Sequence, residues 1–186
     1  MRMFIRGAVA LLILVAAYWG WALAGAAQLA SAARNGDAEA VMERVDLQTL
    51  IRSITSQISR AFLNASAAEM LLRALLTPDN IAALLSQGRV GVLGAGGKDA
   101  GTVWDLPSLG EAFHSRPLQV LMNSYFDGPL SFVVGLNSSD GLYRVHMKLS
   151  GTTWRLSGVD IPEPVSARVA RLIVQRIGGA VGLPGG

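Results

Sequence analysis

The fold is decided by residues 130–157, LSFVVGLNSSDGLYRVHMKLSGTTWRLS, in which apolar and polar residues alternate over three segments. Alternation with a period of two is typical of a β-strand that buries one face. The pairs Ser139-Asp140 and Gly151-Thr152 separate the three segments and predict tight turns. We therefore expect three consecutive antiparallel strands joined by two hairpins.

The two turns also set a register that can be checked for consistency. Two-residue turns at these positions pair Val134 with Val145, and Met147 with Leu156. Both registers place the apolar residues on one face, whereas a shift of one residue would scatter them over both faces. The agreement between the two hairpins supports an antiparallel meander.

Helical patterns precede and follow the strands. The clearest is an amphipathic pattern that starts after Asp46, an N-cap candidate, and places apolar residues from Leu47 to Phe62 on one face. The order of helices, meander and closing helix predicts the α+β class, with a helical layer packed on a C-terminal antiparallel sheet. Further helices are predicted from apolar spacing at residues 38–44, 66–76, 78–85, 109–114 and 165–177, and the first four of them follow the cap candidates Asp37, Ser66, Thr77 and Ser108.

Two stretches have no clear helical or strand pattern. Residues 88–101 are rich in glycine and are expected to form a loop, and residues 117–126 are ambiguous between helix and strand. The loop is not expected to bind phosphate, because Val92 stands where a Walker loop needs its first glycine and Asp99 replaces the magnesium-binding hydroxyl.

The N-terminal segment is apolar enough to enter a membrane. Residues 1–6 form a basic tail with Arg2 and Arg6, and residues 7–27 are uncharged and long enough to cross the hydrocarbon core as a helix of about 30 Å. Three aromatic residues stand where an interfacial belt is expected: Tyr18, Trp19 and Trp21.

A retained transmembrane anchor is the favoured interpretation of this segment. The alternative is a signal peptide cleaved after Ala24, in the small-x-small sequence Ala22-Leu23-Ala24. Retention is favoured because the helical pattern continues past this point. Residues 28–177 would then form the domain and residues 178–186 a disordered tail, and the basic residues ahead of the span predict a cytoplasmic N-terminus.

Composition excludes several kinds of chemistry. The chain of 186 residues has no cysteine, so it has no disulfide, thiol nucleophile or cysteine-ligated metal. Its two histidines, His114 and His146, are far apart, and no serine stands in a nucleophile motif. A net charge of +3 is too small to predict nucleic-acid binding. We therefore expect no enzymatic activity, cofactor, metal or nucleic-acid partner.

The polar face of the predicted sheet is basic. The register sets Lys148 directly opposite Arg155, although like charges facing each other lower stability. An anionic partner such as a lipid headgroup would relieve this repulsion, and a solvated face with screened charge is the alternative. The candidate patch consists of Arg144, His146, Lys148 and Arg155.

Motifs near both ends of the chain resemble an uncharacterised bacterial family, domain of unknown function 2939. The N-terminal motif is Tyr18-Trp19, Leu23, Ala26-Ala27-x-Leu29-x-x-Ala32-Ala33-x-x-Gly36-Asp37, Val45-Asp46-Leu47 and Leu50-x-x-Ser53, and the C-terminal motif is Trp154-Arg155-Leu156-x-x-Val159-x-Ile161-Pro162. The resemblance implies that the apolar segment is retained and leads into the first helix of the domain. It implies no activity.

Together these features predict a single-pass protein of the bacterial inner membrane with a periplasmic or otherwise extracytoplasmic domain. Its expected role is binding or structural, with the bilayer, an anionic lipid or another envelope protein as partner. The alternative is a carrier of a lipid or other apolar small molecule, held in a pocket between residues 70–85 and the sheet.

Overall fold

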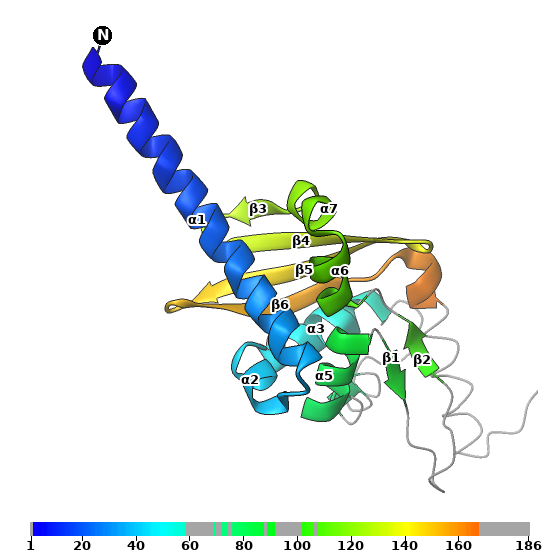
Figure 1. Ribbon diagram of the computed structural model, residues 1–186. Coiled ribbons are helices and arrows are strands. Elements are labelled where there is room, and N and C mark those ends of the chain that lie inside the picture. Colours follow the sequence, from blue (N-terminus) through cyan, green and yellow to red (C-terminus); the bar gives the residue numbers. More distant parts are fainter. Residues whose placement is uncertain are drawn as a thin grey trace, which may run out of the picture.

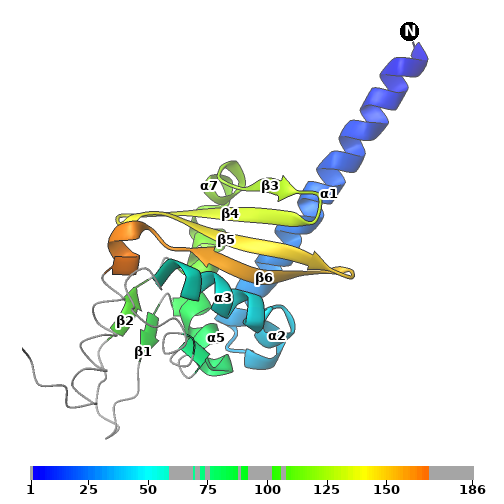
Figure 2. The ribbon, with the colours of Figure 1, turned by 180° about the vertical axis from the view of Figure 1, so that it is seen from behind.

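A long N-terminal helix leads into a domain in which helices cover one face of an antiparallel sheet. The computed structural model describes residues 2–58, 69, 72–73, 76–87, 89–91, 102–105 and 108–167. Helix α1 (Arg2–Arg34) projects from the domain along its first half and lies against the sheet along its second half (Figure 1). The view from behind shows the sheet with α1 on its far side (Figure 2). The predicted α+β class is confirmed.

The sheet has four strands in sequence order, one more than predicted. The predicted register is confirmed, since Val134 pairs with Val145 and Met147 with Leu156. The additional strand precedes the meander and forms its outer edge. The strands are β3 (Tyr125–Gly128), β4 (Ser131–Ser138), β5 (Gly141–Ser150) and β6 (Thr153–Asp160).

A β-bulge interrupts the last strand pair. Met147 pairs with Leu156 but His146 pairs with Gly158, so the intervening Ser157 is the extra residue of β6. The extra residue reverses which face the following β6 side chains occupy. As a result, Asp160 pairs with Arg144 on the basic face.

The predicted helix starts are confirmed where the structure describes them. The Asp37 side chain accepts a hydrogen bond from the backbone N–H of Ala40 at 3.0 Å, and Ser108 accepts one from the N–H of Glu111 at 3.1 Å. Residues 117–126 contain both a helix and the start of β3. The helices after α1 are α2 (Ala38–Glu43), α3 (Leu47–Ile58), α5 (Pro78–Gln87), α6 (Leu109–Ser115) and α7 (Pro117–Met122).

The expectation of a loop over residues 88–101 is wrong for residues 89–91. These form β1 (Arg89–Gly91), which pairs antiparallel with β2 (Thr102–Asp105). A strand of three residues is too short to be predicted within a glycine-rich stretch. The predicted helix at 66–76 is described only in part, while residues 168–177 of the closing helix and the tail 178–186 lie outside the described residues.

The free edge of β6 is covered by the segment that leads into α3. The backbone N–H of Asp46 donates to the carbonyl of Leu156 at 2.8 Å, and the N–H of Leu156 donates to the carbonyl of Arg44 at 2.7 Å. Further along, the Gln57 side chain donates to the carbonyl of Val159 at 2.6 Å. These bonds satisfy backbone groups that an open edge would leave available for pairing with another chain.

Candidate functional site

The junction between α1 and the sheet is the first candidate site. Ala22, Ala26 and Leu29 are fully buried there. Gly25 lies so close to the sheet that a β-carbon on it would stand 2.8 Å from Cβ of Trp154. A row of small residues therefore lets the helix backbone approach the sheet, and the second half of α1 is part of the core.

Aromatic rings hold the helix to the sheet just above this contact. Tyr18 stacks on Phe126 with ring centroids 5.1 Å apart, and it meets Trp154 edge-on at 6.0 Å. Trp21 also meets Trp154 edge-on, at 6.0 Å, while Phe132 packs against Phe126 at 5.0 Å. Such offset and edge-to-face arrangements stabilise by about 0.5–1.5 kcal/mol per pair beyond area burial. The cluster fixes where the exposed half of α1 leaves the domain.

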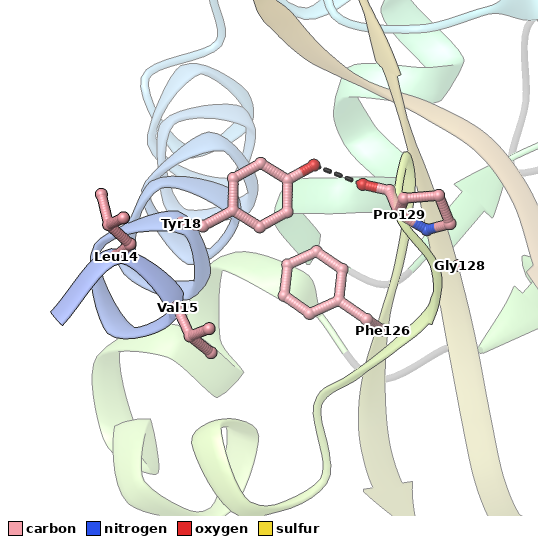
Figure 3. Close-up of a pocket in the computed structure, with 6 residues that line it drawn as sticks. All are labelled: Leu14, Val15, Tyr18, Phe126, Gly128 and Pro129. Carbon is pink, nitrogen blue, oxygen red and sulfur yellow. Dashed lines mark hydrogen bonds between the residues drawn. The ribbon is translucent and has the colours of Figure 1, made fainter. Parts of the chain in front are cut away.

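A shallow apolar cavity of about 430 Å³ lies between α1 and the β3–β4 turn (Figure 3). The Tyr18 hydroxyl donates a hydrogen bond to the carbonyl oxygen of Pro129, so the polar end of this ring has a partner. The lining offers no acid, base or nucleophile, and it suits an apolar chain. It consists of Leu14, Val15, Tyr18, Phe126, Gly128 and Pro129.

The polar face of the sheet is the second candidate site, and it divides into two parts. Lys148 and Arg155 are exposed register partners near the β5–β6 turn. Neither of them forms an ion pair with any residue that the structure describes. At the other part, His146 Nε2 lies 2.9 Å from Oδ2 of Asp160, which also faces Arg144. Asp160, which the bulge brings to this face, thus reduces the positive charge around Arg144 and His146.

A second acid, Asp46, lies near Lys148 and Arg155. Hydrogen bonds from the Thr49 side chain and backbone hold the pKa of Asp46 below its usual value, and the charges of Arg155 and Lys148 lower the pKa further. The two basic residues therefore act on Asp46 through space. Even so, both side chains remain exposed to solvent and available to an anion.

The predicted anchor residues occupy different environments. Arg6 is exposed, and Arg2 begins α1. Tyr18 and Trp19 are half-buried and pack against the core, whereas Trp21 stays 41% exposed. In addition to any contact with lipid, the aromatic residues join the helix to the domain. Their position at a membrane surface stays a prediction.

The remaining ionisable residues do not converge. Within the described ranges, no group of three or more His, Asp or Glu side chains is placed to hold a metal ion. Glu39 and Glu43 are exposed on α2, and His114 is exposed on α6. The expected lack of enzymatic activity stays a prediction.

Sequence reasoning missed Phe126 and the contact face of α1. The sequence predicts a helix that continues past Ala24, but the buried face is formed by the small residues Ala22, Gly25 and Ala26 more than by Leu23. The recurrence of alanine and glycine at spacings of three and four was the available signal. Phe126 had none, because its strand is short and follows an ambiguous segment.

One comparison with known proteins gives a match, and it covers the N-terminal part of the chain. Residues 11–70 match the model of a family described as a protein of unknown function, DUF2939. The predicted resemblance is confirmed over this range, which contains α1 from residue 11 onward, α2, α3 and the N-terminal motif. Neither a curated protein nor a solved structure matches the chain.

Proposed function

We propose that this protein is a single-pass membrane protein whose domain has a binding or structural role, without catalysis, on the outer side of a bacterial inner membrane. One observation carries the proposal: α1 is the one helix of the described residues that is long and apolar enough to cross a membrane, over Phe4–Arg34. Only 6% of its most apolar window is buried, unlike the core helix of a soluble protein. Exposed side chains such as Leu12 and Leu14 need an apolar environment that the domain does not provide.

Retention of α1 is supported over cleavage by its packing. Cleavage after Ala24 would remove Tyr18, Trp21 and the fully buried Ala22 from the core. It would also place a charged amino group on Gly25, which is buried. The mature domain would lose part of its aromatic cluster, which supports the proposal of a retained anchor.

The orientation rests on charge. Arg2 and Arg6 precede the uncharged part of α1. Positive charge beside a span favours the cytoplasmic side. The domain, which follows the span, is thereby assigned to the extracytoplasmic side.

The first experiment tests the anchor by extraction of membranes with alkaline carbonate. The full chain should stay in the pellet, and its intact mass should include residues 1–24. The double variant Leu12→Arg/Ile13→Arg should move to the soluble fraction, because each arginine costs about 2.5–3.5 kcal/mol at the centre of a span. The matched control Gln48→Arg/Thr152→Arg adds the same charge on the domain surface and should stay in the pellet. Extraction of the unmodified chain would refute the anchor.

The second experiment tests orientation and uses the absence of cysteine from the chain. A membrane-impermeant maleimide should label Gln48→Cys in intact spheroplasts. It should label Met3→Cys only after lysis. The opposite pattern would place the domain in the cytoplasm.

The proposed partner at the basic face is an anionic lipid headgroup bound by Lys148 and Arg155. An environment-sensitive label at Thr152→Cys, in the adjoining turn, should respond to phosphatidylglycerol in phosphatidylcholine vesicles. Lys148→Glu/Arg155→Glu should abolish this response, since each basic residue near an anionic surface contributes about 1 kcal/mol. Arg144→Glu should have a smaller effect because Asp160 already faces Arg144. An unchanged response in the double variant would remove this partner.

The carrier alternative receives little support from the described residues. The space between α3, α5 and β6 is about 20 Å³, enough for roughly one water molecule. Leu50, Ile81 and Leu156 are among the side chains that close it. A lipid carried at this position would have to displace the core.

A further inference from the structure

Exposed apolar side chains of the domain gather at one edge. Outside α1, five large hydrophobic side chains are exposed among the described residues, and four of them lie on α7, on β3 or in the β3–β4 turn. The fifth, Leu142, is the least exposed of the five at 38% and lies near the β4–β5 turn. We call the group of four the β3 edge: Leu118 (73% exposed), Met122 (85%), Tyr125 (46%) and Leu130 (53%).

The β3 edge stands beside the point where α1 leaves the domain. Both ribbon views place β3 and α7 side by side at the end of the domain from which the free half of α1 projects (Figures 1 and 2). Stacking of Tyr18 on Phe126 and the bond from Tyr18 to Pro129 fix β3 and its turn to the helix. The edge therefore keeps a constant height relative to the span.

The length of the free helix determines that height. From Gly7, the first residue after the basic tail, to Trp21, α1 rises about 22 Å, and from Ala22 onward one face of the helix is buried in the domain. A bilayer core is about 30 Å thick, or a few Å less in thin membranes. Because α1 continues into the domain with no linker, a helix that spans the core has to bring the domain down to the membrane surface.

We propose that the β3 edge is a lipid-contact surface that rests in the boundary between headgroups and acyl chains. This inference rests on the proposed membrane anchor and adds where the domain meets the bilayer. Apolar side chains in this boundary are stabilised by burial of their surface, in the same way as the apolar face of an interfacial helix.

Continuity with the span argues for lipid as the occupant. The cavity beside the edge is walled on one side by Leu14 and Val15, whose exposed side chains belong to the spanning half of α1. An acyl chain next to the helix can therefore enter it. On the adjoining strand, Lys148 pairs with Ser131, the residue after Leu130, which brings a cation to the same end of the sheet. Apolar side chains next to exposed cations are complementary to a lipid surface, which presents acyl chains and anionic headgroups.

The experiment measures depth with single cysteines in the full chain, reconstituted in phosphatidylcholine–phosphatidylglycerol vesicles. An environment-sensitive fluorophore is attached at Leu130→Cys or Met122→Cys, both exposed positions. Gln48→Cys, exposed on α3, serves as the aqueous control, and Leu12→Cys as the reference within the span. Each emission spectrum is recorded with ordinary lipids and with lipids brominated along the acyl chain.

The labels at Leu130 and Met122 should emit at shorter wavelength than the label at Gln48 and be quenched by brominated lipid. Water-like, unquenched emission from both, with quenching retained at Leu12, would overturn the lipid-contact surface and leave the anchor intact. Short-wavelength emission without quenching would also overturn it, because protein, such as a second copy of the chain, would then cover the edge. Loss of quenching at Leu12 would instead reject the anchor itself.

Discussion

The two halves of α1 are both largely apolar but lie in opposite environments. In the first half, Leu12 and Ile13 are more than 60% exposed, and Val9, the least exposed of the Leu, Ile and Val side chains there, is still 49% exposed. In the second half, Ala22, Ala26 and Leu29 are completely buried. The sequence assigns residues 7–27 to the span and thus places part of the buried half in the membrane. Side-chain size separates the two halves, because bulky residues cover a lone helix in lipid whereas small residues let a helix pack closely on a sheet.

The largest expected effect compares the same substitution in the two halves. Leu29→Ala should lower the free energy of unfolding by about 2–5 kcal/mol, because it leaves a cavity between α1 and the domain. Leu12→Ala should change it by less than about 0.5 kcal/mol, since no domain residue packs there. Denaturation of the full chain in detergent, followed by tryptophan fluorescence, measures both. Equal losses would mean that the exposed half also contributes to the folded core.

A smaller effect is expected from the glycines of the helix. Gly25→Ala should destabilise by about 1–3 kcal/mol, as its methyl group would stand 2.8 Å from Cβ of the buried Trp154. Gly20→Ala meets nothing within 4 Å and should stabilise by up to about 1 kcal/mol through helix propensity. The same unfolding measurement applies. A stabilising Gly25→Ala would show that α1 does not approach the sheet as closely as the structure places it.

The sequence predicts those parts of the fold that local patterns specify. The hairpin register followed from two-residue turns and from alternation, and both pairings are present. The helix starts at Asp37, Asp46 and Ser108 followed from capping chemistry. In each case the decisive residues are close in sequence, so the pattern contains the information.

Features set by distant contacts could not be predicted in this way. The bulge at Ser157 lies at the end of the segment from which the register was predicted, and it moves Asp160 to the basic face and divides the predicted patch. Strand β3 is short, and its ring Phe126 is placed by Tyr18, more than one hundred residues earlier in the chain. The two candidate sites therefore depend on tertiary packing that sequence spacing does not encode.

The smallest expected effect concerns the domain, which is compared with the exposed half of α1. It is expected at the N-cap of α3, beside β6. Asp46 accepts hydrogen bonds from the Thr49 backbone N–H at 3.1 Å and hydroxyl at 2.7 Å. Asp46→Ala removes the cap and should lower the free energy of unfolding by about 0.5–2 kcal/mol. Because the cap lies far from the exposed half of α1, the variant should stay in the carbonate-washed membrane pellet.

The charge of Asp46 gives this prediction a dependence on pH. The pKa of Asp46 is lower in the folded chain than the usual 3.8. The ionised carboxylate therefore stabilises the fold fully above the unfolded pKa, and this stabilisation is lost as the pH falls through the lowered folded pKa. Asp46→Asn keeps an N-cap acceptor without the charge, so its stability difference from the unmodified chain should shrink on acidification. Unfolding curves from neutral pH to pH 3 measure this difference. A constant difference would mean that the carboxylate of Asp46 is not selectively stabilised by folding, so Thr49, Arg155 and Lys148 would not act on it as the structure indicates.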